Sequence, residues 1–259
     1  MLRTLLAHPL TRGLNIDAPQ TAVLRWRIIR DKPFLRQIYQ EWYASIASSL
    51  SALGVVDGPI LELGSGGDFS REHIPSLIST DILQIPNIDL ILDGQSLPFP
   101  AVSLNGIVMI NVLHHLHQSR KFFTEATRCV RPYGVIAMVE PWITSWSRLV
   151  YTRFHHERIE PGVKDWEFSP NGPLSGANSA LPWIIFKRDR VQFELEYPEW
   201  QIHEISPMMP FRYLFSGGVS MRSFMPGGTY RFWRWIEGIL DPWIDKLAMF
   251  SLIVLSRIG

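Results

Sequence analysis

The sequence has little cysteine, little net charge and no long apolar run among its 259 residues. The single cysteine, Cys129, excludes an internal disulfide and a cysteine-based zinc cluster, and it favours a reducing compartment such as the cytoplasm. A net charge of +1 provides no global field to attract nucleic acid. The apolar stretch from Leu247 to Leu255 falls well short of the roughly 20 residues of a membrane-spanning helix, so we expect none.

Hydrophobic residues, by contrast, make up 46% of the chain and include ten tryptophans. This composition is typical of a globular protein with a sizeable core. Apolar residues recur every three or four positions from Pro33 to Leu53, which predicts one long helix. We therefore assign residues 1–57 to an N-terminal helical cap and residues 58–259 to one α/β domain.

Short apolar segments alternate with helical or loop segments between residues 58 and 140. They predict strands at 59–63, 77–80, 88–92, 107–110 and 135–139, and a helix at 119–131. Strands that are apolar on both faces indicate a parallel sheet covered by helices on both sides. Farther along, the patterns predict a helix at 187–197, strands at 201–205 and 250–257, and an apolar helix face over 232–247 that breaks at Asp241-Pro242.

The segment Glu62-Leu63-Gly64-Ser65-Gly66-Gly67 lies between the first strand and an expected helix. Glycines at such a turn let a ligand approach the backbone closely. Asp81 ends the second strand, and Asp93, followed by Gly94, ends the third. Ligands of open α/β sheets bind at these carboxyl ends, where Asp81 can accept hydrogen bonds from ribose hydroxyls and Asp93 from the amine of a base. Either aspartate alone is also typical of a turn or a helix N-cap.

As a set, these residues resemble the motifs of the class I, Rossmann-like S-adenosylmethionine (SAM)-dependent methyltransferases. The resemblance begins at Ile60–Gly67 and continues through Asp81 and through Asp93–Phe99. It ends with Asn111–Leu116 and Val130–Gly134, and it covers about a third of the chain with order and spacing preserved. It implies a three-layer sandwich around a seven-stranded, mostly parallel sheet whose last strand is antiparallel, with SAM as the cofactor.

The resemblance also assigns roles to individual residues. The cofactor-binding set would be Glu62, Gly64, Ser65, Gly66, Gly67, Asp81, Ile82, Asp93, Gly94 and Asn111. The glycine loop would pass beneath methionine and ribose, Asp81 would hold the ribose, and Ile82 would pack on adenine. Asp93 and Gly94 would read the adenine edge, and Asn111 would lie near the methionine. Glu62 would fix the loop from behind or accept from the cofactor ammonium.

Two positions depart from the family pattern. Asp68 stands where the family has a third glycine, and Tyr133-Gly134 replaces a pair of glycines. Asp68 would narrow the methionine end of the site or place a carboxylate near the cofactor ammonium. The same residue disfavours NAD as the ligand, because a pyrophosphate at that helix N-terminus would meet a negative charge.

Two long segments, about 141–183 and 206–249, would leave the sheet on the cofactor side as lid insertions that form the substrate pocket. An oligomer interface or a membrane-facing patch is the alternative use of these segments. Arg212 and Arg222 lie in a stretch without acids, which suggests an anionic substrate group. Further substrate candidates are His156 and Glu157, and the candidates for a general base are His114, His115 and His155. No histidine spacing of a zinc protease is present, so we predict no metal site.

These features predict a SAM-dependent methyltransferase that acts on a small molecule, a sugar or a lipid-linked glycan. The segments Trp166–Phe168, Pro173–Asn178 and Pro210–Tyr213 resemble bacterial methyltransferase-like proteins linked to surface-polysaccharide synthesis. One alternative is a SAM- or nucleoside-binding protein without catalysis. Another is a peripheral membrane adaptor that binds the inner face of the membrane through its basic N-terminal arm and its tryptophan-rich C-terminal helices. The oligomeric state stays open, and we expect no nucleic-acid partner.

Overall fold

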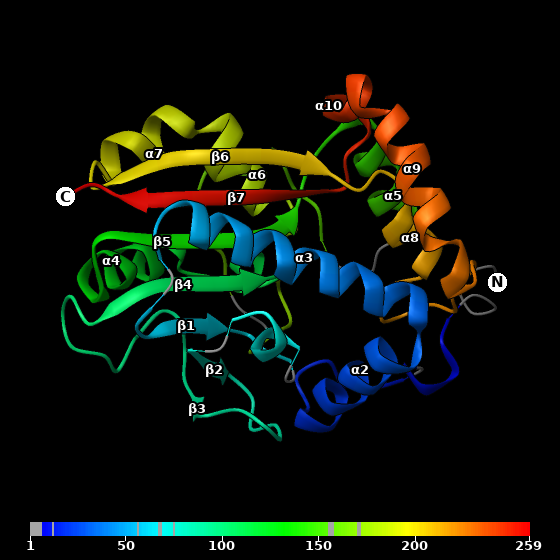
Figure 1. Ribbon diagram of the computed structural model, residues 1–259, viewed down its shortest axis with the longest axis horizontal. Helices are drawn as coiled ribbons and strands as arrows, with labels where there is room; N and C mark the ends of the chain where they lie inside the picture. The colour runs from blue at the N-terminus through cyan, green and yellow to red at the C-terminus, as the bar shows by residue number, and fades with distance from the viewer. Residues whose placement is uncertain are drawn as a thin grey trace.

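A computed structural model describes residues 7–11, 13–55, 57–66, 69–74, 76–154, 158–169 and 172–259 (Figure 1). The strands are β1 (Ile60–Leu63), β2 (Leu77–Asp81), β3 (Leu90–Ile91), β4 (Leu104–Ile110), β5 (Val130–Pro141), β6 (Trp200–Met208) and β7 (Phe250–Arg257). The α-helices are α2 (Pro19–Asp31), α3 (Pro33–Ala52), α4 (Ser119–Cys129), α5 (Ser145–Phe154), α6 (Leu181–Trp183), α7 (Arg190–Glu196), α8 (Arg212–Ser216), α9 (Tyr230–Ile239) and α10 (Ile244–Leu247). Shorter turns are η1 (Pro9–Thr11), η2 (Ser70–Glu72), η3 (Leu113–His115), η5 (Gly227–Thr229), η6 (Asp241–Trp243) and the π-turn η4 (Ile184–Arg188).

The seven strands form one sheet in the order β3-β2-β1-β4-β5-β7-β6. Strands β1 to β5 pair in parallel, whereas β7 runs antiparallel to both β5 and β6. This confirms the predicted sheet with its antiparallel seventh strand. Strand β4 is buried along its whole length because both faces of the sheet are covered. The arrows of β1, β4 and β5 point to the right in Figure 1, so their carboxyl ends share one edge.

Helix α3 covers one face of the sheet and crosses in front of it in Figure 1. Its buried residues include Leu35, Ile38, Trp42, Ile46 and Leu50, at the spacing that predicted the helix. They pack in one apolar core with strand residues such as Val108 and Ala137. The alternate residues Ile107 and Ile136 belong to the opposite core, which α4, η4 and α7 complete. The result is the expected three-layer arrangement of helix, sheet and helix.

The prediction of a helix after the glycine loop is wrong for the described residues of the connection between β1 and β2. Between β1 and β2 the described residues contain only the 3₁₀ turn η2. The glycine loop occupies the start of this short segment, and Pro75 disfavours the α conformation at Ile74. Helix α3 covers this part of the sheet instead, because Ile60 and Leu77 share its apolar core.

Several other boundaries differ from the sequence prediction. The first insertion was expected to be irregular, but it contains α5, whose Val150 and Tyr151 are buried against the core. Strand β3 is reduced to two residues, and β6 continues to Met208. The predicted helix at 187–197 is confirmed as α7, and the predicted break at Asp241 separates α9 from α10. Within the described ranges, no helix combines the length and apolar character needed to cross a membrane.

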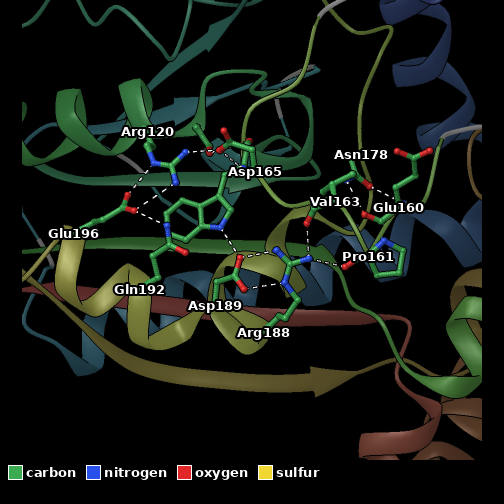
Figure 2. Close-up of polar contacts among 12 residues, drawn as sticks. Arg120, Glu160, Pro161, Val163, Asp165, Asn178, Arg188, Asp189, Gln192 and Glu196 are labelled. Carbon is green, nitrogen blue, oxygen red and sulfur yellow. Dashed lines mark hydrogen bonds and ion pairs between the residues drawn. The ribbon is translucent and has the colours of Figure 1, made fainter.

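The first insertion is anchored on α4 and α7 by the polar network drawn in Figure 2. Trp166 is 1% exposed, and its indole N–H donates to Asp189 at 2.9 Å. The Arg120 guanidinium lies over the same ring at 4.7 Å and pairs with Asp165 and Glu196 at 2.6 and 2.9 Å. Trp166 therefore belongs to the core beneath α4, rather than to a lid above the cofactor.

Candidate active site

A cavity of about 440 Å³ lies at the carboxyl ends of the parallel strands. The glycine loop and the ends of β2 and β4 line one part of it. The other part is lined by α2 and α3, by α5 from the first insertion, and by α8 with the loop that follows it in the second. Both insertions therefore reach the cavity. The N-terminal helices reach it too, which the sequence did not reveal.

The glycine loop has the backbone conformation that its sequence suggests. Gly64 and Gly66 have φ angles of +64° and +58°, in the left-handed region where a side chain is strained. A Cβ atom on Gly64 would stand 2.5 Å from Cγ2 of Val112, so the loop has no room for one. The amide of Ser65 donates to the carbonyl of Thr80 at 2.9 Å and ties the loop to β2.

Glu62 lies behind this loop and does not line the cavity. Its carboxylate is 2% exposed and accepts hydrogen bonds from the hydroxyls of Tyr43 and Ser70 at 2.8 and 2.7 Å. Burial raises the pKa of Glu62, although these two hydroxyls act against the rise. Of the two roles considered for Glu62, its position favours fixing the loop from behind over contact with a ligand.

Asp81 ends β2 at the cavity wall. Its Oδ1 accepts from the amide of Leu83 at 2.9 Å, and its Oδ2 accepts from the amide of Gly66 at 3.2 Å. Burial raises the pKa of Asp81, while these backbone amides and that of Ile82 favour the ionised form. The side chain of Ile82 is 36% exposed on the same wall and offers an apolar surface.

Asp93, Gly94 and Asn111 complete the wall that the sequence predicted. The carboxylate of Asp93 accepts from the amide and side chain of Gln95 at 2.9 and 3.0 Å, which fixes its orientation. A Cβ atom on Gly94 would lie 3.0 Å from Leu63, so the backbone stands close to β1. Asn111 has a φ of +57°, a conformation that asparagine adopts more readily than most residues.

The two histidines after β4 lie at the cavity with different partners. Nδ1 of His114 is 2.7 Å from Oε2 of the fully buried Glu140. Oε1 of Glu140 accepts from the amides of Val112 and Leu113, both at 2.7 Å, so this carboxylate positions the turn as well as the imidazole. Nδ1 of His115 is 2.9 Å from the carbonyl of Leu174, in the first insertion.

The N-terminal segment holds both insertions in place over the cavity. The carboxylate of Asp17 accepts from the amide of Leu174 and the hydroxyl of Ser175, both at 2.7 Å. Lys32 is 7% exposed, and its ammonium donates to the carbonyls of Gly218 and Met221 at 2.6 and 2.9 Å. Burial lowers the pKa of Lys32 to about 8. The cap therefore closes the site rather than only covering the sheet.

Six cavity residues come from the cap, and none of them was predicted: Ala22, Arg25, Trp26, Ile29, Tyr39 and Tyr43. Burial raises the pKa of Tyr39 to about 12, while the Arg25 guanidinium and a hydrogen bond with Asn111 favour the ionised phenol. This places Arg25 near the phenol of Tyr39. The cluster of arginines before residue 31 was visible in the sequence, but no local pattern showed which of them faces inward.

Comparison with known proteins identifies the central segment. Residues 62–138 match a protein family described as "Methyltransferase domain". The match covers less than a third of the chain. It supports S-adenosylmethionine as the cofactor. A search of curated proteins gave no match.

Solved structures show distant similarity to the chain. A Burkholderia thailandensis 1,6-didemethyltoxoflavin N1-methyltransferase is 10% identical, with a TM-score of 0.49 and coverage of 98% of this chain and 100% of that one. Geranyl diphosphate C-methyltransferase from Streptomyces coelicolor is 12% identical, with a TM-score of 0.47 and coverage of 98% and 90%. A SAM-dependent methyltransferase from Archaeoglobus fulgidus is 13% identical, with a TM-score of 0.46 and coverage of 83% and 94%. Nothing about the acceptor follows from similarities this distant.

The residues of the matched segment fit SAM. The absence of room for a Cβ atom at Gly64 shows a close backbone turn at the cavity wall. Asp81 can still accept a hydrogen bond from a ligand. A carboxylate offers about four lone-pair positions, and three backbone amides occupy only part of them. The cavity is large enough for a ligand of this size. Among the described residues no group of histidine, cysteine, aspartate and glutamate side chains could hold a metal ion.

The positions of Arg212 and Arg222 contradict the expected role in substrate binding. Arg212 is 4% exposed, and its guanidinium donates to both carboxylate oxygens of Glu41 at 2.8 and 2.9 Å. The same group also pairs with Glu237 and donates to the Tyr230 hydroxyl at 2.6 Å. Arg222 is exposed, and neither arginine lines the cavity. The stretch around them lacks acids, but the fold supplies acids from α3 and α9.

The remaining predicted residues lie outside the part of the chain that the structure describes. These are Gly67 of the glycine loop, Asp68 after it, and His155, His156 and Glu157 in the first insertion. Their proposed roles remain predictions from the sequence.

Proposed function

We propose that the chain transfers the methyl group of SAM to an acceptor that is largely apolar and carries one anionic group. The part of the cavity away from the glycine loop supports the apolar half of this proposal. It is lined by side chains of Trp26, Ile29, Val150, Leu214 and Phe250. A bare sugar would leave many hydroxyls without partners on such a surface, and each unpartnered buried polar group is costly. Of the acceptor classes considered from the sequence, a small molecule of largely apolar character fits best.

Arg25 is the observation that carries the anionic half of the proposal. It lines the cavity, is only partly exposed, and lies near the phenol of the partly buried Tyr39. No ion pair joins Arg25 to an acid among the described residues. A guanidinium on an apolar wall gains most from a carboxylate or phosphate of the ligand, because a bidentate, charge-assisted pair offsets its loss of hydration. Arg25 therefore takes the role that the sequence suggested for Arg212 and Arg222.

The chemistry asks mainly for alignment from the protein. SAM supplies an electrophilic methyl group on a sulfonium, and transfer requires the acceptor atom in line with the breaking bond. Asp81 and the glycine loop would fix the cofactor, and the apolar wall would fix the acceptor and exclude water. An acceptor that is already ionised needs no base. For a hydroxyl acceptor, His114 is the best-placed base, because Glu140 holds its Nδ1 and thereby orients the ring.

Methyl transfer from SAM labelled with tritium in the methyl group tests this proposal. The substrates are lipid, polysaccharide and water-soluble fractions of the source organism. We expect label in an acidic compound that extracts into organic solvent, and loss of that label in Arg25→Gln. Arg27→Gln is the matched control, because Arg27 lies two residues away on the same helix but is exposed and outside the cavity.

Three results would contradict parts of the proposal. Label in the polysaccharide or water-soluble fraction would favour a glycan or polar acceptor instead. Saturable SAM binding without transfer to any fraction would favour the non-catalytic binding protein. If Arg25→Gln weakened SAM binding as much as it reduced transfer, the guanidinium would bind the carboxylate of the cofactor and not an anion of the acceptor.

A further inference from the structure

The C-terminal helices carry a row of large apolar side chains that face solvent. We name Phe232, Trp235, Ile239 and Trp243 the outer stripe; they are 54%, 62%, 51% and 53% exposed. Their spacing of three, four and four residues places them on one side of α9 and its continuation η6. Single exposed apolar residues are ordinary, but a contiguous row that includes two tryptophans marks a surface that binds something.

The charges around the outer stripe favour an anionic partner. Arg231 of α9 and Lys246 of α10 are exposed, whereas Arg234 of α9 pairs with Glu41 of α3 at 3.5 Å and is not counted here. Helix α5, which packs against α10, adds the exposed Arg148. The exposed acids on these elements are Asp241 and Asp245, so basic side chains outnumber acidic ones. Glu237 is buried in the ion pair with Arg212 and does not reduce this surplus.

We propose that the outer stripe docks the protein onto a lipid bilayer that contains anionic headgroups. Tryptophan and phenylalanine insert at the level of the headgroups, and flanking arginine and lysine side chains bind lipid phosphates. Figure 1 places α9 and α10 at the outer edge of the molecule, where a flat surface can reach them. A short helix of this kind lies on a membrane and does not cross it, which agrees with the lack of a spanning helix among the described residues.

The outer stripe lies close behind the wall of the active site. Helix α8 carries Tyr213 and Leu214, which line the cavity. Its next residue, Phe215, packs on Trp233 of α9 with ring centroids 4.5 Å apart. One layer of side chains therefore separates the cavity wall from the docking helix. An apolar acceptor would be richest at such a surface, although the docking inference does not depend on the acceptor.

Cosedimentation with lipid vesicles tests the docking. The probes are vesicles of phosphatidylcholine alone and of phosphatidylcholine with phosphatidylglycerol. The test variant is Phe232→Ser/Trp235→Ser. The matched control is Val191→Ser/Leu195→Ser, which removes two apolar side chains that are 70% and 77% exposed on α7. Figure 1 shows α7 at the opposite end of the sheet.

We expect the wild type to bind the anionic vesicles and the control to bind equally well. The outer-stripe variant should bind at least about tenfold more weakly, because full burial of each large side chain is worth about 1.5–3 kcal/mol and the stripe is about half buried already. SAM titration of each variant verifies that it is folded. The vesicle readout requires no methyl transfer, so its failure and the failure of the proposed function are distinguishable.

A label on the stripe itself provides a second readout. Cys129 is fully buried, so Ile239→Cys introduces the one accessible thiol among the described residues. A polarity-sensitive fluorophore there should shift to the blue with anionic vesicles, and the same fluorophore on Leu195→Cys should not. Absence of wild-type binding would overturn the proposal, as would a label at position 239 that stays in water. A wild-type dimer that the stripe variant converts to monomers would also overturn it, because the stripe would then be a subunit interface.

Discussion

Replacing Asp81 with asparagine tests the cofactor site most directly, because the change keeps the shape and removes the charge. In the wild type, Oδ1 holds the amide of Leu83 and Oδ2 holds the amide of Gly66 at 3.2 Å. The asparagine oxygen can keep the bond to Leu83. Its NH₂ group would then face the N–H of Gly66, donor against donor, and the glycine loop would lose this support.

The magnitude follows from the acceptor capacity of the carboxylate. Three backbone amides, those of Gly66, Ile82 and Leu83, use part of about four lone-pair positions, which leaves about one for a ribose hydroxyl. A hydrogen bond to a charged group contributes about 1.5–3 kcal/mol, so SAM should bind about 10- to 100-fold more weakly. The free energy of unfolding without ligand should change by less than about 1 kcal/mol, because removal of a buried charge offsets the lost backbone bond.

Titration calorimetry with SAM measures the affinity, and chemical denaturation measures the stability. Asp31→Asn is the control, since Asp31 is exposed on α2 and does not line the cavity. Burial raises the pKa of Asp81, so the carboxyl gains its proton at a higher pH than a free aspartate does. Wild-type affinity for SAM should therefore fall as the pH drops through this raised pKa, and the Asn variant should lack that fall. A folded Asp81→Asn protein that binds SAM within about twofold of the wild type would refute the site map.

Three further predictions concern the loop, the buried arginine and the buried lysine. Gly64→Ala forces a Cβ atom to 2.5 Å from Val112 at a φ of +64°, so it should cost about 1–3 kcal/mol of stability and weaken SAM binding. Gly66→Ala should cost less stability, because a Cβ atom there meets nothing within 4 Å. Equal losses for the two variants would contradict the steric argument. Arg212→Met removes the guanidinium that joins Glu41 and Glu237 and leaves Glu237 without a cationic partner, while Glu41 keeps Arg234 at 3.5 Å. The free energy of unfolding should fall by about 3–5 kcal/mol, and the folded fraction should keep the SAM affinity of the wild type. Wild-type stability would contradict the internal role of this arginine. The pKa of Lys32 is lowered from 10.5 to about 8, so as the pH rises Lys32 loses its proton in the folded state before it does in the unfolded state. Wild-type stability should then rise relative to Lys32→Met between pH 8 and 10.5, by as much as about 3 kcal/mol, and parallel pH curves for the two proteins would rule this out.

The sheet and its cofactor edge were predictable because their signals are local. Period and length of the apolar segments predicted β1, β2, β4, β5 and β7, and the long periodic segment predicted α3. Glycine and aspartate at the ends of successive parallel strands must meet at one edge, so their clustering follows from topology alone. The crossover helix after the glycine loop was the misleading part, because a glycine turn at the end of a strand commonly leads into a helix, and this short segment forms none in its described residues.

What the arginines do was decided only by the tertiary structure. Arg212 stands in a stretch without acids, yet it pairs with Glu41, which lies 171 positions away along the chain. Arg25, one of several arginines near the N-terminus, lines the cavity because α2 packs there. The apolar face of α9 was visible in the sequence, but periodicity does not show whether such a face meets a core or solvent. Charge pairing and burial depend on which distant segments pack together, and local patterns of residues do not encode that.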